Sequence, residues 1–214
     1  MTTATMPADW TVADLLAHFG PIAHRRIRQD PPPGTATEQD VIDIHDREKR
    51  LFELVDGVLV EKAMGVQESF LAIFIASVLR DFGTLHQLGF VLGADGMARL
   101  APGLVRIPDV SFISWRHFPG RRVPRIPMFM SGPDLAVEVL SPSNTTQEME
   151  RKLHDYFAAG VRLVWYVDPV ARTVEVFTAV DRAVVLRQDQ SLTGDPVLPG
   201  LVLPLRDLFA ELEP

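Results

Sequence analysis

The stretch PDLAVEVLSPS, from Pro133 to Ser143, decides the fold of this chain. Along residues 135–140, both faces of the predicted strand are apolar except for the carboxylate of Glu138. A strand that is apolar on both faces is typical of the interior of a sheet covered on both sides. An isolated carboxylate is costly in such a place unless it meets a cation, a metal or a hydrogen-bond network. Glu138 is therefore predicted to have such a partner.

A second acid and a lysine accompany Glu138. Asp109 lies within a similar apolar stretch, IPDVSFI, in a strand predicted over residues 106–114. Lys152 lies in ERKLHDYFAAGV, a helix predicted over residues 147–159. Two acids on central strands and a lysine on the next helix are the groups needed to hold Mg²⁺ and cut a phosphodiester. Asp109 could instead cap a turn after Pro108, but the apolar pattern around it favours the site.

The remaining elements follow from turn signals and apolar spacing. Two capping boxes, Thr11 with Asp14 and Thr37 with Asp40, predict short helices in the first 49 residues. Asp56-Gly57 predicts a hairpin, and apolar residues at helical spacing over residues 66–82 predict a long helix. Further strands are predicted at 89–92, 98–100, 105–114, 134–140, 163–167, 173–178 and 183–187, and a last helix at 206–212.

This order of elements predicts an α/β fold with a central mixed β-sheet flanked by helices. Residues 1–49 are predicted to form a helical N-terminal extension, and residues 50–214 the main domain. No glycine-rich strand-to-helix turn occurs, which argues against a Rossmann fold, and no P-loop sequence occurs either.

Composition narrows the class of protein. The chain has 214 residues, of which 47% are hydrophobic, so it can bury a substantial core. It has no run of about eighteen apolar residues, and its first ten residues do not resemble a secretion signal. The absence of cysteine excludes disulfides, thiolate nucleophiles and cysteine-based zinc sites. We therefore expect a cytoplasmic protein that does not associate with membranes.

The net charge of −7 argues against a protein that coats nucleic acid, since such proteins are basic. It does not exclude an enzyme that meets DNA through one local patch. Positive side chains are clustered in residues 24–28 and again in residues 116–125. Each cluster is either a DNA-contacting patch or a solvated loop, and both interpretations stay open.

Several segments together resemble the bacterial "putative restriction endonuclease" family of the PD-(D/E)xK nuclease superfamily. They are ELVDGVLVEK (53–62), IPDVSFI (107–113), PDLAVEVLSPS (133–143), Lys152 with Tyr156 and Gly160, and VWYVDP (164–169). The resemblance implies a restriction-endonuclease-like core and Mg²⁺-dependent (or Mn²⁺-dependent) endonuclease activity on DNA. It implies Asp109, Glu138 and Lys152 as the catalytic residues, and a homodimer is expected because two active sites cut duplex DNA.

The lysine departs from the usual superfamily pattern. That pattern places a lysine two residues after the second acid, where this chain has Leu140. In the family that the chain resembles, the lysine has moved to the following helix, and Lys152 matches that position.

The metal ligands expected from this scheme are Asp109, Glu138 and the backbone carbonyl of Val139. Lys152 would orient the attacking water or contact the scissile phosphate. Glu68 is the candidate for a further acidic ligand and Glu53 is the alternative. Glu68 is equally an ordinary acid in the first turn of a helix, and Glu53 could instead support a loop by pairing with an arginine.

Two rival functions stay open. One is a non-catalytic module of the same fold that binds DNA or protein, and the other is a nuclease that acts on RNA or single strands. Tyr156 is expected to be a core aromatic with a satisfied hydroxyl, and Asp168-Pro169 is expected to form a turn.

Overall fold

A six-stranded mixed sheet lies at the centre of the computed structural model, which describes residues 10–210 and residue 212. Its strand order is β10-β9-β8-β7-β6-β3. The β7–β8 pair is parallel, and the other neighbouring pairs are antiparallel. The strands are β3 (Gly89–Leu92), β6 (Val110–Ser114), β7 (Leu135–Val139), β8 (Leu163–Asp168), β9 (Thr173–Ala179) and β10 (Arg182–Arg187). The predicted central mixed sheet is confirmed.

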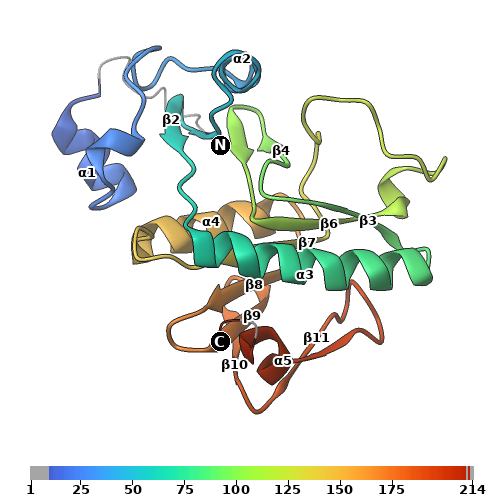
Figure 1. Cartoon of the computed structure of the whole chain (residues 1–214). Coiled ribbons are helices and arrows are strands. Elements are labelled where there is room, and N and C mark those ends of the chain that lie inside the picture. The colour runs from blue at the N-terminus through green and yellow to red at the C-terminus, as the bar shows by residue number, and fades with distance from the viewer. Residues whose placement is uncertain (1–9, 211, 213–214) are drawn as a thin grey trace.

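Helices α3 (Val66–Leu85) and α4 (Thr146–Ala158) contribute to two separate cores around this sheet (Figure 1). Leu71 and Ile75 of α3 pack in one buried cluster with Val137 of β7. Met149 of α4 packs in another with Ala136, the next residue of the same strand. Strand β7 is therefore covered on both faces, as its sequence predicts. Helix α4 forms the crossover connection that the parallel strands β7 and β8 require.

A second sheet of four strands, in the order β2-β1-β5-β4, lies between the N-terminal helices and the central sheet (Figure 1). Its strands are β1 (Phe52–Val55), β2 (Val58–Glu61), β4 (Ala98–Ala101) and β5 (Leu104–Arg106). The predicted hairpin is confirmed, because Asp56 and Gly57 turn with φ of 50° and 73° between β1 and β2. A Cβ on Gly57 would lie 2.5 Å from the carbonyl carbon of Gly34, so this turn also requires glycine for space.

The N-terminal helices α1 (Val12–Phe19) and α2 (Glu38–Glu48) begin at the two predicted capping boxes. Between them, the 3₁₀ turn η1 (His24–Arg26) places the Arg26 guanidinium against Glu148 of α4, at 2.7 and 3.1 Å. Residues 1–9 of the predicted extension lie outside the described residues, and the boundary at residue 49 stays a prediction.

One predicted strand is wrong. The stretch 105–114 is not a single strand: β5 ends at Arg106 in the four-stranded sheet, and β6 begins at Val110 in the central sheet. Pro108 has no N–H to donate to a ladder, and the peptide groups of Ile107 bond to side chains instead. The break carries the chain from one sheet to the other, and it sets Asp109 at their junction.

The C-terminal part adds a small sheet that sequence patterning did not predict. Strands β11 (Ser191–Thr193) and β12 (Val202–Pro204) pair, and α5 (Leu205–Ala210) follows them. A second 3₁₀ turn, η2 (Trp115–His117), follows β6. None of the helices in the described residues combines the length and hydrophobicity that a membrane crossing requires.

Candidate active site

Asp109, Glu138 and Lys152 lie together at the junction of the two sheets. The Asp109 N–H donates to the Val137 carbonyl at 2.9 Å, and its carboxylate accepts from the Val139 N–H at 2.7 Å. Asp109 therefore bonds to the residues on either side of Glu138 on the neighbouring strand. The Lys152 ammonium lies 3.1 Å from each carboxylate oxygen of Glu138. The site is deeply buried, with 5% of Asp109, 5% of Glu138 and 4% of Lys152 exposed.

Glu53, the alternative acid, also joins this group. One oxygen lies 3.1 Å from the Lys152 ammonium and accepts the Ile107 N–H, also at 3.1 Å. The other accepts from the Arg106 guanidinium at 2.8 Å. Arg106 in turn contacts Asp155 of α4 at 2.5 Å. Glu53 therefore pairs with an arginine, which was the structural alternative to its being a metal ligand. It also contacts Lys152, the candidate catalytic lysine.

Lys62 is the residue of this group that sequence reasoning missed. Its ammonium lies 2.8 Å from the Asp109 carboxylate and donates to the Ile107 carbonyl at 2.5 Å. The chain has only three lysines, Lys49, Lys62 and Lys152, and two of them are buried against these acids. That scarcity, together with the position of Lys62 just after an apolar hairpin, was the signal available in the sequence.

Tyr156, one turn after Lys152 on α4, is fully buried, and its hydroxyl donates to the Glu138 carboxylate. The expected core aromatic with a satisfied polar tip is confirmed. Burial, followed by the charge of Glu138, raises the pKa of the Tyr156 hydroxyl well above its usual value. Tyr156 therefore stays protonated and serves Glu138 as a neutral donor.

Burial and the neighbouring charges act in opposite directions on the pKa values of the acids and bases of the site. Burial by itself would raise the pKa of Glu53, but Lys152 and then Arg106 outweigh it and hold this pKa at about 2. Burial raises the pKa of Glu138, and Asp109 adds to the rise while Lys152 opposes it. Burial would lower the pKa of Lys152, but Glu138 and Glu53 reverse that effect and raise it.

The lowered pKa of Glu53 predicts an acid-sensitive fold. Since its pKa is about 2 in the folded protein and 4.5 in the unfolded chain, its contribution is complete above about pH 5. The contribution, on the order of 3 kcal/mol, is lost as the pH falls towards 2. Urea unfolding of wild type and Glu53→Gln should show a stability difference that is constant above about pH 5 and narrows below it. A gap that widened on acidification would contradict this assignment.

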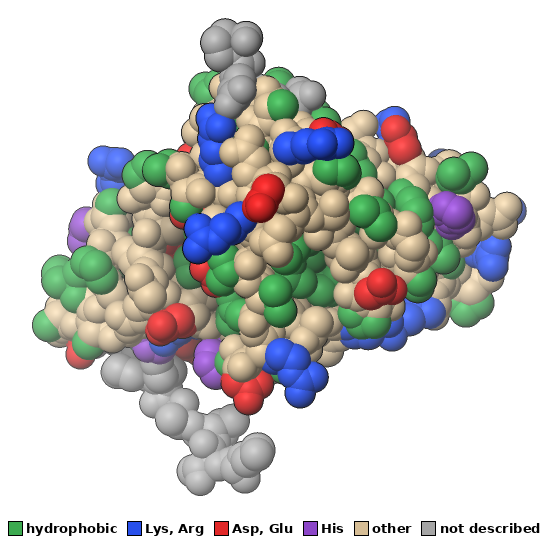
Figure 2. Space-filling model, turned by 90° about the horizontal axis from the view of Figure 1, so that it is seen from below, with side chains coloured by type: hydrophobic (Ala, Val, Ile, Leu, Met, Phe, Trp, Pro, Cys, Tyr) green, Lys and Arg blue, Asp and Glu red, His purple; other side chains and the backbone are tan. Residues whose placement is uncertain are grey.

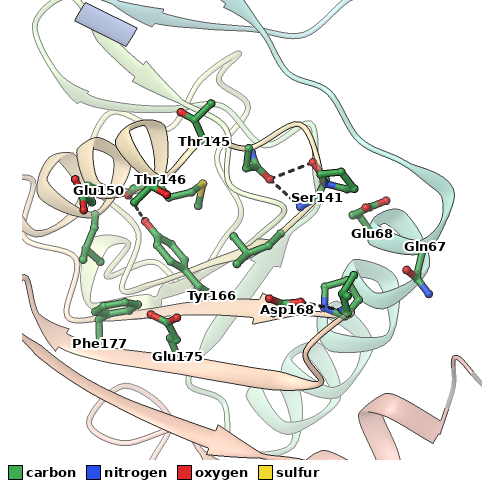
Figure 3. Close-up of a pocket in the computed structure, with 17 residues that line it drawn as sticks. Gln67, Glu68, Ser141, Thr145, Thr146, Glu150, Tyr166, Asp168, Glu175 and Phe177 are labelled. Carbon is green, nitrogen blue, oxygen red and sulfur yellow. Dashed lines mark hydrogen bonds between the residues drawn. The ribbon is translucent and has the colours of Figure 1, made fainter. Parts of the chain in front are cut away.

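Glu68, the other candidate for a further ligand, is placed differently. It is the third residue of α3 and folds back over the N-cap, since a Cβ on Gly65 would lie 2.2 Å from its carboxylate. It lines a cavity of about 660 Å³ together with Ser141, Asp168 and other residues (Figure 3). Its position is typical of acids in the first turn of a helix, and its role as a metal ligand stays a prediction.

In the described part of the chain, no three His, Cys, Asp or Glu side chains are grouped so that they could hold a metal ion. The donor chemistry nevertheless suits Mg²⁺, because Asp109 and Glu138 offer hard oxygen ligands from adjoining positions. Each carboxylate is neutralised by an ammonium, Lys62 at Asp109 and Lys152 at Glu138. The two carboxylates therefore suit a divalent cation once one of these ammonium groups has moved away from its carboxylate.

The comparisons with known proteins agree with this architecture. A family model described as "Putative restriction endonuclease", Uma2, matches residues 38–206. The chain belongs to the Uma2 family. All of the site residues lie inside the matched range, whereas α1 and η1 precede it.

The fold of this Uma2 chain also matches a solved structure, described as the crystal structure of a putative nuclease belonging to DUF820 from Anabaena variabilis. The TM-score is 0.68 at 21% sequence identity, over 77% of this chain and 92% of that chain. At this identity the match supports the restriction-endonuclease-like fold alone. No curated protein matches the chain.

Two of the three arginines in the first basic cluster of this Uma2 protein are engaged in ion pairs, whereas Arg25 is exposed. Arg26 is buried in its ion pair with Glu148, and Arg28 forms a bidentate ion pair with Glu48 at 2.7 and 2.8 Å. On the face drawn in Figure 2, basic side chains are interspersed with acidic ones, and no continuous basic stripe crosses it.

The second basic cluster remains exposed at Arg121, Arg122 and Arg125. It follows Ser114 at the C-terminal end of β6, whereas Asp109 precedes the N-terminal end of that strand. Five strand residues span about 17 Å. The loop that carries this cluster therefore leaves the sheet about one strand length from Asp109.

Proposed function

We propose that this Uma2 protein is a Mg²⁺-dependent endonuclease (or Mn²⁺-dependent) that hydrolyses phosphodiester bonds of DNA. The observation that carries the proposal is the convergence of Asp109, Glu138 and Lys152 in one buried cluster, where the chain crosses between its two sheets. Charged groups are rarely buried unless they are paired, and perturbed pKa values such as that of Glu138 cluster at functional sites.

In this proposal Asp109, Glu138 and the Val139 carbonyl hold the divalent cation. When bound, such an ion supplies an activated water and neutralises charge on the phosphate. Lys152 keeps Glu138 ionised and presents an ammonium to the phosphate or the attacking water. Tyr156 fixes the orientation of Glu138 through its hydrogen bond, and Glu53 does the same for Lys152.

The closed state of the site adds one condition. Because the carboxylates of Asp109 and Glu138 are each about 5% exposed, a phosphate reaches them only after a covering segment moves. The connector that follows the β1–β2 hairpin supplies Lys62, whose ammonium lies 2.8 Å from the Asp109 carboxylate, so this side chain is taken as part of the cover. We infer that substrate or metal binding opens the site at this side.

The direct test is cleavage of a supercoiled plasmid by the purified protein. Mg²⁺ or Mn²⁺ should support nicking or linearisation, whereas Ca²⁺ should support binding without efficient cleavage, because it is a larger and less rigidly coordinated ion. Linear product formed without a nicked intermediate would fit the proposed homodimer. No cleavage of duplex DNA, single-stranded DNA or RNA would contradict the proposal.

The second candidate is a non-catalytic module that binds DNA or protein. The observation that favours it is that Glu53, Asp109 and Glu138 are each already paired with a lysine or arginine of the protein itself. A melting-temperature series in Mn²⁺ separates the two, because a ligand that binds only the folded state raises the melting temperature. For a module that does not bind metal, Mn²⁺ should change the melting temperature of wild type no more than that of variants that lack Asp109 or Glu138.

A further inference from the structure

Lys62 lies where a divalent cation would meet Asp109. Its ammonium contacts only oxygen acceptors in the described structure, the Asp109 carboxylate at 2.8 Å and the Ile107 carbonyl at 2.5 Å. Carboxylate and carbonyl oxygens are also the ligands of Mg²⁺ and Mn²⁺. An ammonium and a divalent ion therefore compete for the same atoms.

We propose that Lys62 is an internal counterion, which occupies the cation position of the metal-free protein and must leave Asp109 before a divalent ion binds. The inference rests on the proposed function, because it takes Asp109 as a metal ligand. It assigns Lys62 a role that differs from that of Lys152. Lys152 lies on α4, and its ammonium is held between Glu53 and Glu138.

The charge balance of the site supports an exchange. Four carboxylates (Glu53, Asp109, Glu138 and Asp155) face three cations (Lys62, Arg106 and Lys152), so the net charge of the group is −1. Without the Lys62 ammonium the group carries −2, which a divalent cation neutralises. If Lys62 stayed, a divalent ion would leave a buried charge of +1. Exchange therefore gives a neutral buried site, which burial favours.

The attachment of Lys62 allows this movement. Its backbone N–H is held by the Leu51 carbonyl at 2.9 Å, so the main chain has a fixed pivot. The residues that follow, Ala63 and Gly65, are exposed and lie outside any helix or strand. A lysine carries its ammonium on a flexible four-carbon stem. The side chain can therefore swing outward while the hairpin stays in place.

The test compares Mn²⁺ binding by wild type, Lys62→Met and Lys49→Met, using isothermal titration calorimetry. Methionine replaces the aliphatic stem of the lysine with an unbranched side chain one atom shorter and removes the charge. Lys49 is exposed, and its ammonium bonds to the backbone carbonyl of Asp46. Its variant therefore makes the same change in net charge, from −7 to −8, away from the acids. We expect Lys62→Met to bind Mn²⁺ about tenfold more tightly or better, and Lys49→Met to bind like wild type.

Equal or weaker Mn²⁺ binding by Lys62→Met would overturn the inference about Lys62 while leaving the proposed metal site standing. If neither wild type nor Lys62→Met bound Mn²⁺ at millimolar concentration, the metal-dependent function would fall together with it. The two failures are therefore distinguishable.

A second measurement uses the wild-type protein, so it does not depend on the folding of a variant. Brief acetylation followed by mass spectrometry reports how exposed each lysine amine is. Adding Mn²⁺ should raise the modification of Lys62 several-fold and leave Lys49 unchanged. A Lys62 signal that is unaffected by saturating Mn²⁺ would show that the ammonium stays at Asp109, which contradicts the exchange.

Discussion

Replacing Asp109 with Asn or Glu138 with Gln is expected to slow DNA cleavage by a factor of about a hundred or more. Each substitution removes a negative charge and an oxygen ligand from the proposed cation site and changes the shape of the side chain very little. Both variants should also bind Mn²⁺ more weakly than wild type. The measurements are the rate of plasmid nicking at saturating metal and the calorimetric affinity for Mn²⁺.

Asp181→Asn is the matched control, because Asp181 is an exposed acid in the turn between β9 and β10, away from the two strands that carry the site. It makes the same change in charge and should cleave like wild type. Cleavage at the wild-type rate by all three variants would indicate a contaminating nuclease and would remove the support for these two acids.

Lys152→Met is expected to lower the free energy of unfolding by about 3–5 kcal/mol. The Lys152 ammonium is the shared partner of Glu53 and Glu138, each at 3.1 Å, and all three side chains are buried. Removing it leaves two carboxylates facing each other with one cation fewer, so the net charge of the group changes from −1 to −2. Urea unfolding at neutral pH measures the loss.

Glu138→Gln provides the contrast for this prediction. It brings the net charge of the same group from −1 to zero, and the glutamine oxygen can still accept the Tyr156 hydroxyl. Burial disfavours the charge of Glu138 and raises its pKa, so removing that charge offsets part of the lost ion pair, and the stability of the metal-free protein should change by about 1 kcal/mol or less. A loss of unfolding free energy as large as that of Lys152→Met would show that the Glu138–Lys152 ion pair is needed for the stability of the fold.

Much of the fold could be predicted from local signals. The Asp56-Gly57 turn, the two capping boxes and the doubly apolar strand around Glu138 each depend on residues close in sequence, and the structure confirms them. The small sheet of β11 and β12 was missed, because each strand has only three residues and shows no alternation long enough to detect.

The site was predictable only in part. Asp109 and Glu138 stand out because they interrupt apolar strands, but the break at Pro108 was hidden inside a continuous apolar pattern. Lys62 reaches Asp109 across 47 residues of sequence and Arg106 reaches Glu53 across 53, and sequence spacing does not predict such tertiary contacts. Glu68 was selected for its place on a helix, which says nothing about the direction of its side chain.

The Arg26–Glu148 pair has a consequence for folding kinetics. It joins residues 122 positions apart, so we expect it to form after α4 has packed on the central sheet. Contacts of such long range enter late along a folding route, and contacts absent from the transition state act mainly by slowing unfolding. The turn η1, which precedes the region shared with the Uma2 family, is therefore expected to prolong the lifetime of the folded protein through Arg26 without speeding its formation.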